Sequence, residues 1–225
     1  MRNRTLANSQ WTAGLLRDRL GLASEVVYPP VAGGFPRVPW GEREDGFVVM
    51  GRLVPEKGIG TIVAILAEVR KEQPVHLHVI GRRGPAAAVR EIEELCRRHA
   101  DWVHFEGEMY GPEKERFLAG HKYGISGCRS EAFGIAVAEM VKAGCLVWAP
   151  DGGGQTEILA HPELIYAGRD EAAAKIRGVL TEPEKQTRLR DHLRAQAELF
   201  SAERFVREMR AIVGEFLEEN RAGAS

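Results

Sequence analysis

The chain has 225 residues, of which 44% are hydrophobic and 28% charged, and its formal net charge is −1. This composition is that of a globular protein able to bury a core, and the near-zero net charge argues against a nucleic-acid-binding protein. Cys96, Cys128 and Cys145 lack CxxC spacing, so we expect reduced thiols and neither a zinc site nor a disulfide framework. No signal-peptide core or membrane-length apolar run is present, which predicts a cytoplasmic protein without a transmembrane segment.

The first forty residues predict a short strand, a helix and a connector. TLANS, residues 5–9, is typical of a strand end, and the following WTAGLLRDRL predicts a helix capped by Ser9 or Thr12. Four prolines and three glycines then fall within residues 26–45, which indicates an irregular connector.

The middle of the chain alternates short Val/Ile-rich runs with segments of helical period. Six such alternations predict an α/β fold with a doubly wound, Rossmann-like parallel sheet covered on both faces. The chain should therefore divide into residues 1–40, a sheet domain over 41–182, and two amphipathic helices over 183–225. The expected strands are 47–50, 75–80, 102–105, 123–127, 145–149 and 164–167, and the expected helices are 58–72, 85–100, 112–120, 133–143, 154–160 and 170–180.

Glycines and charged residues follow five consecutive strands. In an open parallel sheet ligands bind beyond the carboxyl ends of the strands, so these loops form the candidate site. Arg52 and Lys57, in GRLVPEKG, provide two cations that suit a diphosphate, unless they are merely solvated loop charges. The glycines of DGGGQTEIL, residues 151–159, form either an anion-binding loop or a tight turn. Neither GxGxxG after the first strand nor GxxxxGK[ST] occurs, which argues against a dinucleotide or P-loop site.

Two glutamates belong to the segment of the helix expected at 133–143: Glu131 lies just before the helix and Glu139 lies within it. The other residues of this helix are so apolar that we expect it to be buried nearly all round, and Glu139 then needs hydrogen-bond donors. A ribose offers two hydroxyl donors, and Glu131, in the loop before the helix, would meet the group beyond the phosphates. The alternative pairs Glu139 with Lys142 on an exposed edge.

Histidines and arginines elsewhere leave several alternatives open. His76 and His78 share one side of a strand, and without a third ligand we expect two partly buried imidazoles and no metal site. His121 and Lys122 precede the fourth strand and either approach a bound sugar or form a surface turn. Arg82 and Arg83 contact either phosphate or base, or are solvated.

Three motifs in order, GRLVPEKGI, EAFGIAVAE with its Glu-x7-Glu spacing, and APDGGGQTEIL, resemble the group 1, family four retaining glycosyltransferases of the GT-B fold. NSQWTAGLL, VVYPPV and HKYGISG are more loosely similar to the dolichol-pathway mannosyltransferase branch. The resemblance implies a nucleoside diphosphate sugar donor, GDP- or UDP-linked, and no cofactor or metal. The absence of Asp-x-Asp fits that metal-independent chemistry.

The resemblance also implies roles for individual residues. Arg52 and Lys57 would hold the donor diphosphate, Glu131 the sugar and Glu139 the ribose. The remaining residues would surround the phosphates, the sugar or the base, and they are Gly81, Arg82, Phe133, Gly134, Ile135, Gly153, Gly154 and Gln155.

The length departs from the family pattern. GT-B enzymes place the active site between two Rossmann domains, and residues 1–40 are similar only to the end of the first. We therefore expect an enzyme that is incomplete without an N-terminal acceptor domain or partner chain, peripheral to the membrane in its full form. The alternatives are a non-catalytic nucleotide-sugar-binding module, a subunit of a split glycosyltransferase, and a nucleotide-sugar epimerase. The apolar side of the terminal helices would cover the sheet or a partner, through Phe200, Phe205, Met209, Ile212, Val213 and Phe216.

Overall fold

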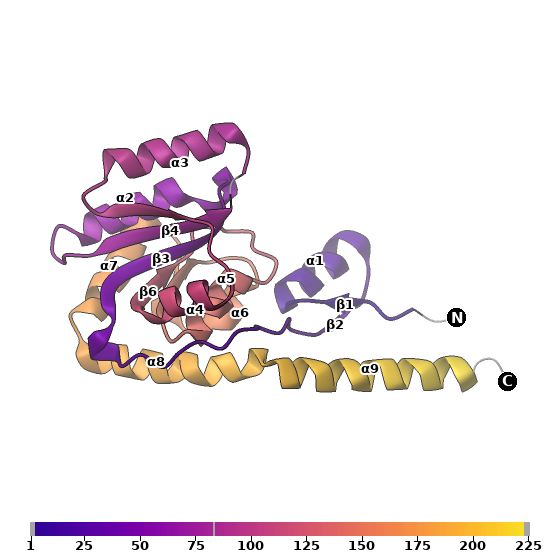
Figure 1. Cartoon of the computed structure of the whole chain (residues 1–225). Coiled ribbons are helices and arrows are strands. Elements are labelled where there is room, and N and C mark those ends of the chain that lie inside the picture. The colour runs from indigo at the N-terminus through magenta and orange to yellow at the C-terminus, as the bar shows by residue number, and fades with distance from the viewer. Residues whose placement is uncertain (1–2, 83, 223–225) are drawn as a thin grey trace.

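A computed structural model describes residues 3–82 and 84–222 of the chain, and its centre is a six-stranded, fully parallel sheet (Figure 1). The strand order is β5-β4-β3-β6-β7-β8, so the chain builds one half outward from β3 and then returns to build the other half from β6. The predicted doubly wound parallel sheet is confirmed. The strands are β3 Glu44–Arg52, β4 His76–Arg82, β5 Val103–Gly107, β6 His121–Ile125, β7 Leu146–Pro150 and β8 Ile165–Tyr166.

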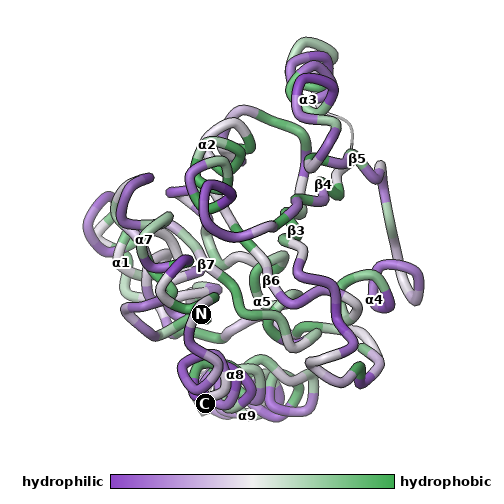
Figure 2. Tube along the Cα trace, turned by 90° about the vertical axis from the view of Figure 1, so that its left-hand side faces the viewer, coloured by the Kyte–Doolittle hydropathy of each residue, from purple (hydrophilic) through white to green (hydrophobic). Residues whose placement is uncertain are grey.

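Helices follow the strands and cover both faces of the sheet. Figure 2 shows α2 and α7 on one side and α4, α5 and α8 on the other. Each of the six predicted strand–helix alternations is present, with ends that differ by up to three residues from the predicted ones. The connecting helices are α2 Ile59–Val69, α3 Ala86–Arg98, α4 Gly111–Ala119, α5 Ile135–Lys142, α6 Gln155–Leu159 and α7 Arg169–Leu180, with short 3₁₀ turns at Pro55–Lys57 and Pro162–Leu164.

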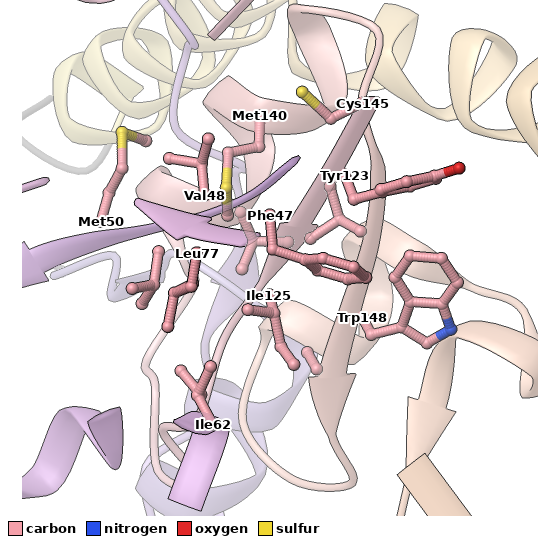
Figure 3. Packing of buried hydrophobic residues seen from close by; sticks show 14 of the residues in the cluster. Phe47, Val48, Met50, Ile62, Leu77, Tyr123, Ile125, Met140, Cys145 and Trp148 are labelled. Carbon is pink, nitrogen blue, oxygen red and sulfur yellow. The ribbon is translucent and has the colours of Figure 1, made fainter. Parts of the chain in front are cut away.

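The central strands are apolar on both faces because both faces are covered. Phe47 and Val48 are neighbours that point to opposite sides of β3, and both are fully buried. The Phe47 ring packs against Tyr123 and Trp148, with ring centroids 5.0 and 5.8 Å apart (Figure 3). Burying each such side chain contributes about 1.5–3 kcal/mol, so this cluster fixes the positions of β3, β6 and β7.

The N-terminal segment forms a small separate unit. β1, Leu6–Ala7, pairs in parallel with β2, Glu25–Val26, and α1, Gln10–Leu20, connects them. Of the two predicted caps, Ser9 is the one observed, because its Oγ accepts a hydrogen bond from the Thr12 amide at 3.0 Å. The proline-rich connector then leads through a 3₁₀ turn at Trp40–Glu42 into the sheet.

The two C-terminal helices differ in what they cover. α8, Pro183–Ala197, packs on the sheet through Leu189 and Leu193, each 2% exposed. After a 3₁₀ turn at Glu198–Phe200, α9, Ala202–Ala222, extends alongside β1 and β2 (Figure 1). Of the apolar residues expected to cover the sheet or a partner, Phe200 and Ile212 are buried, whereas Val213 is 48% exposed.

The helices and the cysteines can be compared with what the composition predicts. Among residues 3–82 and 84–222, no helix has both the length and the apolar character that crossing a bilayer requires. Cys96, Cys128 and Cys145 are buried free thiols, as the sequence predicts.

Candidate functional site

The strand order creates a switch point between β3 and β6. The chain leaves β3 toward β4 on one side and leaves β6 toward β7 on the other, and in open parallel sheets ligands bind in a crevice at such a point of the carboxyl edge. The β3–α2 loop contains Lys57 and the β6–α5 loop contains Glu131. These two of the residues that the sequence places at the site therefore lie at this switch point.

Two glycines hold the switch-point loops in direct contact. A Cβ atom on Gly58 would lie 2.8 Å from the Gly127 carbonyl oxygen, and one on Gly127 would lie 2.7 Å from the Lys57 carbonyl oxygen. Gly58 also has φ +62°, in the left-handed region that favours glycine. The close approach of the two backbones places the Lys57 and Glu131 side chains opposite each other.

Lys57 and Glu131 form an ion pair across the crevice. The Lys57 Nζ donates to Glu131 Oε2 at 2.5 Å, and the two side chains are 23% and 26% exposed. Arg52, the last residue of β3, is exposed at the same edge. The Lys57–Glu131 pair and the exposed Arg52 therefore lie at the edge of the sheet where ligands bind in folds of this kind.

Glu139 lies on α5 and pairs with a residue that the sequence reasoning missed. Lys114 Nζ, from α4, donates to Glu139 Oε1 at 2.7 Å, and the carboxylate side chain is 16% exposed. The Lys142 ammonium instead donates to the Val31 carbonyl at 2.5 Å, so the alternative that paired Glu139 with Lys142 is wrong. No local pattern could have found Lys114, because it is 25 positions away in another helix.

The prediction that α5 is buried nearly all round is also wrong. Ile135 is 43% exposed, and Glu139 and Lys142 are partly exposed at the same face, four and seven positions later. The remaining face carries Val137, Ala138, Met140 and Val141, which are all buried. The helix therefore has an ordinary amphipathic arrangement with a narrow open face at the carboxyl edge.

The start of α5 presents backbone donors beside Glu131. Gly134 precedes the helix with φ +104°, and among the described residues no side chain caps this end. The first amide groups of an α-helix have no intrahelical acceptor, and the helix dipole is positive there. Phe133 is 2% exposed and packs on Tyr28 and Phe200, so it anchors the loop and only its backbone is placed to meet a ligand.

The glycine loop packs tightly under the Glu131 segment. A Cβ on Gly153 would lie 2.4 Å from the Glu131 carbonyl oxygen, and one on Gly154 would lie 2.5 Å from the Ala132 carbonyl oxygen. The Gly154 amide donates to the Glu131 carbonyl at 2.8 Å. These glycines therefore support the loop that carries Glu131.

Gln155 is fully buried, and its amide bonds to the protein. Its Oε1 accepts from Ser126 Oγ at 2.9 Å, and its Nε2 donates to the Cys128 carbonyl and, at 3.3 Å, to the Gly152 carbonyl. Gln155 thus connects the β6–α5 loop to the glycine loop from below. Its position fits a supporting role better than direct contact with a ligand.

Glu157, in the same segment, holds the N-terminal unit. Its carboxylate accepts from the Gln10 and Trp11 amides, each at 2.9 Å, and from the Tyr28 hydroxyl at 2.8 Å. Burial together with this carboxylate raises the pKa of Tyr28 to about 12. No local pattern predicts a role for Glu157, since its partners are about 130–150 positions away.

Two of the predicted site residues, Gly81 and Arg82, are the last residues of β4. Gly81 is buried, and a Cβ there would lie 2.4 Å from Leu53 Cδ2 and 2.7 Å from the Gly51 carbonyl oxygen. Gly81 thus allows close packing against the end of β3. The backbone of Arg82 ends β4 opposite Arg52, whereas its side chain and all of Arg83 lie outside the described part of the chain.

His121 and Lys122 cannot approach a ligand at this crevice. They begin β6, whereas the crevice lies beyond its last residue, Ile125. Lys122 pairs with Asp45 at 2.8 Å at the amino edge of the sheet. The alternative that placed these two residues near a sugar is wrong, because a parallel strand separates its two ends across the full width of the sheet.

Comparison with known proteins identifies the family. Residues 35–196 match the family model described as "Glycosyl transferases group 1". The chain is 31% identical over 172 residues to D-inositol 3-phosphate glycosyltransferase of Jonesia denitrificans, covering 72% of this chain and 40% of the relative. It is 23% identical over 248 residues to GDP-Man:Man(3)GlcNAc(2)-PP-Dol alpha-1,2-mannosyltransferase of Dictyostelium discoideum, covering 97% of this chain and 49% of the relative.

The fold agrees with solved structures of glycosyltransferases. Anabaena Alr3699/HepE in complex with UDP and glucose superposes with a TM-score of 0.79 at 18% identity, covering 94% of this chain and 63% of that one. The chain spans less than half the length of the two curated relatives named above. The family match extends over most of the chain, and the chain belongs to the group 1 glycosyltransferases.

Proposed function

We propose that the crevice between the ends of β3 and β6 binds a nucleoside diphosphate sugar as the donor for glycosyl transfer. The observation that carries this proposal is the Lys57–Glu131 pair, which spans the switch point beside the uncapped start of α5. A diphosphate needs cations and backbone donors, and a sugar needs hydrogen-bond acceptors, so both are provided at one place.

Each side chain receives a role from its position. Lys57 and the neighbouring Arg52 bind the diphosphate and neutralise the charge that develops as the glycosidic bond breaks. The amides at Gly134 and Ile135 bind phosphate oxygens at the helix start. Glu131, released from Lys57 when the phosphates arrive, accepts hydrogen bonds from the sugar hydroxyls.

Glu139 binds the ribose in this proposal, and Lys114 supports it. The Lys114–Glu139 pair neutralises a carboxylate that would otherwise be costly to keep partly buried. Glu139 lies on the same partly exposed face of α5 as Ile135, four positions later. Ile135 is itself one of the two residues whose amides bind phosphate in this proposal. Ribose hydroxyls at this face donate hydrogen bonds to the Glu139 carboxylate.

The finer statements about the reaction rest on the family. We propose metal-independent transfer with retention, carried out together with an N-terminal acceptor half that closes the crevice from the other side. The name of the Dictyostelium relative specifies GDP-mannose, and the Anabaena structure holds UDP and glucose. Both GDP- and UDP-linked donors therefore remain candidates for this chain.

A second candidate is a nucleotide-sugar-binding subunit that does not turn over alone. The chain covers 40–49% of the two relatives, and the small β1–β2 unit leaves Leu6 and Leu20 37% and 64% exposed. A surface of this kind suits a partner chain or domain. Transfer by a mixture with a separately supplied N-terminal half, and none by the isolated chain, would favour the split arrangement.

Isothermal titration calorimetry tests the binding site. The chain is titrated with UDP, GDP and ADP, and the preferred nucleotide is then titrated into Lys57→Ala and Lys71→Ala. We expect about a 10-fold or greater loss of affinity for Lys57→Ala, since a charge-assisted hydrogen bond contributes about 1.5–3 kcal/mol. Lys71 pairs with Glu68 on the surface of α2 and serves as the matched control. Equal affinities in both variants would place the phosphates elsewhere.

A further inference from the structure

Three histidine side chains and one carboxylate meet at the amino edge of the sheet, opposite the proposed donor site. His76 and His78 lie on β4, His121 begins β6 and Glu44 begins β3. The His78 ring lies 4.7 Å from the His121 ring and 4.8 Å from the His76 ring, between centroids. The sequence pairs only His76 and His78 on one side of a strand and therefore predicts no metal site.

The surroundings of two imidazoles fix which nitrogen carries the proton. His78 Nδ1 lies 2.6 Å from Glu106 Oε1, and His121 Nδ1 lies 2.7 Å from the Phe117 carbonyl oxygen. Both partners are acceptors, so in each neutral ring Nδ1 is the donor and Nε2 keeps its lone pair. A carboxylate or carbonyl on the far nitrogen is the usual support of a metal-binding histidine.

The two free lone pairs are buried. His78 Nε2 and His121 Nε2 are inaccessible to solvent and have no hydrogen-bond partner among the described residues. His121 is only 3% exposed as a whole. Buried polar atoms of this kind are rare unless a water or an ion meets them, so the two lone pairs point to a group bound between these rings.

His76 and Glu44 complete the set from the open side. Glu44 Oε2 lies 3.5 Å from His76 Nε2 and 3.7 Å from His121 Nε2, and its side chain is 64% exposed. One ligand atom from each of Glu44, His76, His78 and His121 lies within 4.8 Å of the others. A tetrahedral ion with ligand distances of about 2.0–2.2 Å would draw these atoms together by about 1 Å.

The backbone leaves space for the imidazoles at this place. A Cβ on Gly46 would lie 2.3 Å from His76 Nε2 and 2.9 Å from His121 Cδ2, so only glycine accommodates the cluster as it stands.

We infer that His76, His78, His121 and Glu44 bind a divalent transition-metal ion of the Zn²⁺ class. Imidazole and carboxylate ligands in a four-coordinate set suit this class better than Mg²⁺ or Ca²⁺, which prefer oxygen. The ion joins β3, β4 and β6 at their first residues and so stabilises the folded chain. It lies at the opposite edge from Lys57 and takes no part in the proposed transfer.

Co²⁺ and Zn²⁺ binding to the tag-free, EDTA-treated chain tests this inference. We expect one Co²⁺ per chain with the intense visible absorption of a tetrahedral site, displacement by Zn²⁺, and a rise in melting temperature with Zn²⁺. A spectrum of six-coordinate Co²⁺ without a rise in melting temperature would overturn the inference, and this result needs no variant.

Substitutions of single residues test which side chains bind the ion. His76→Gln alters the most accessible of the three histidines and should weaken Co²⁺ binding about 100-fold, and Glu106→Gln should weaken it about 10-fold through the orientation of His78. His192→Gln is the control, since His161 and His192 form a histidine pair with ring centroids 5.2 Å apart at another place. Unchanged Co²⁺ affinity in His76→Gln, or a greater loss in His192→Gln, would place the ion elsewhere and contradict the assignment.

Discussion

Single side chains at the carboxyl edge are held by partners from other elements. Glu131 pairs with Lys57, and Glu139 pairs with Lys114. Both pairs are about one-fifth exposed, so each carboxylate is partly desolvated and depends on its cation. A ligand that replaces these contacts must itself offer hydrogen-bond donors, which the hydroxyls of a nucleotide sugar do.

Glu139→Gln should weaken nucleotide binding about 10-fold without unfolding the domain, because the amide keeps the volume of the side chain but loses its charge. Glu113→Gln, in an exposed position on α4, is the control. Calorimetry measures the affinity, and circular dichroism measures the melting temperature of each variant. If Glu139→Gln binds as tightly as Glu113→Gln, Glu139 does not contact the ribose.

Elements are positioned by close backbone contacts that a sequence pattern does not reveal. The strands and helices themselves follow from the periodicity, since runs such as 47–50 and 145–149 are too apolar to be exposed. Which loops touch depends on the strand order. The Gly58–Gly127 contact, 69 positions apart, exists because β3 and β6 are neighbours.

Gly127→Ala should destabilise the fold by about 1–3 kcal/mol, because its Cβ would lie 2.7 Å from the Lys57 carbonyl oxygen and the two loops would have to separate. Gly60→Ala, in α2, is the matched control, since a Cβ there meets no atom within 4 Å. Gly60→Ala should leave the free energy of unfolding unchanged or raise it by up to about 1 kcal/mol. Urea unfolding measures both variants, and equal stability would show that the loops do not touch as described.

Glu157→Ala should loosen the N-terminal unit while the sheet stays folded. The variant removes the acceptor of two α1 amides and of the Tyr28 hydroxyl. Limited proteolysis should then cut within residues 10–28 at least several-fold faster, and Tyr28→Phe, which removes only one of these bonds, should have a smaller effect. Identical cleavage rates in wild type and Glu157→Ala would contradict the assigned contacts.

At the scale of the whole molecule, sequence and structure agree on the parallel sheet and differ mainly at its edges. The Glu-x7-Glu spacing can be read from the sequence, but the contacts of Lys114, Glu157 and His121 cannot. Each of these residues contacts a partner that is far away in the sequence, and only the order of the strands brings the two together. The two edges of one sheet thereby differ, with the Lys57–Glu131 pair at the carboxyl edge and an imidazole cluster at the amino edge.

Hydrogen–deuterium exchange with and without saturating nucleotide tests the position of the donor site most directly. We expect slower exchange in peptides covering residues 52–58 and 131–139 and unchanged exchange at residues 43–46 and 121–122 at the opposite edge. Slower exchange confined to the amino edge, or none in either carboxyl-edge peptide under saturation, would contradict it.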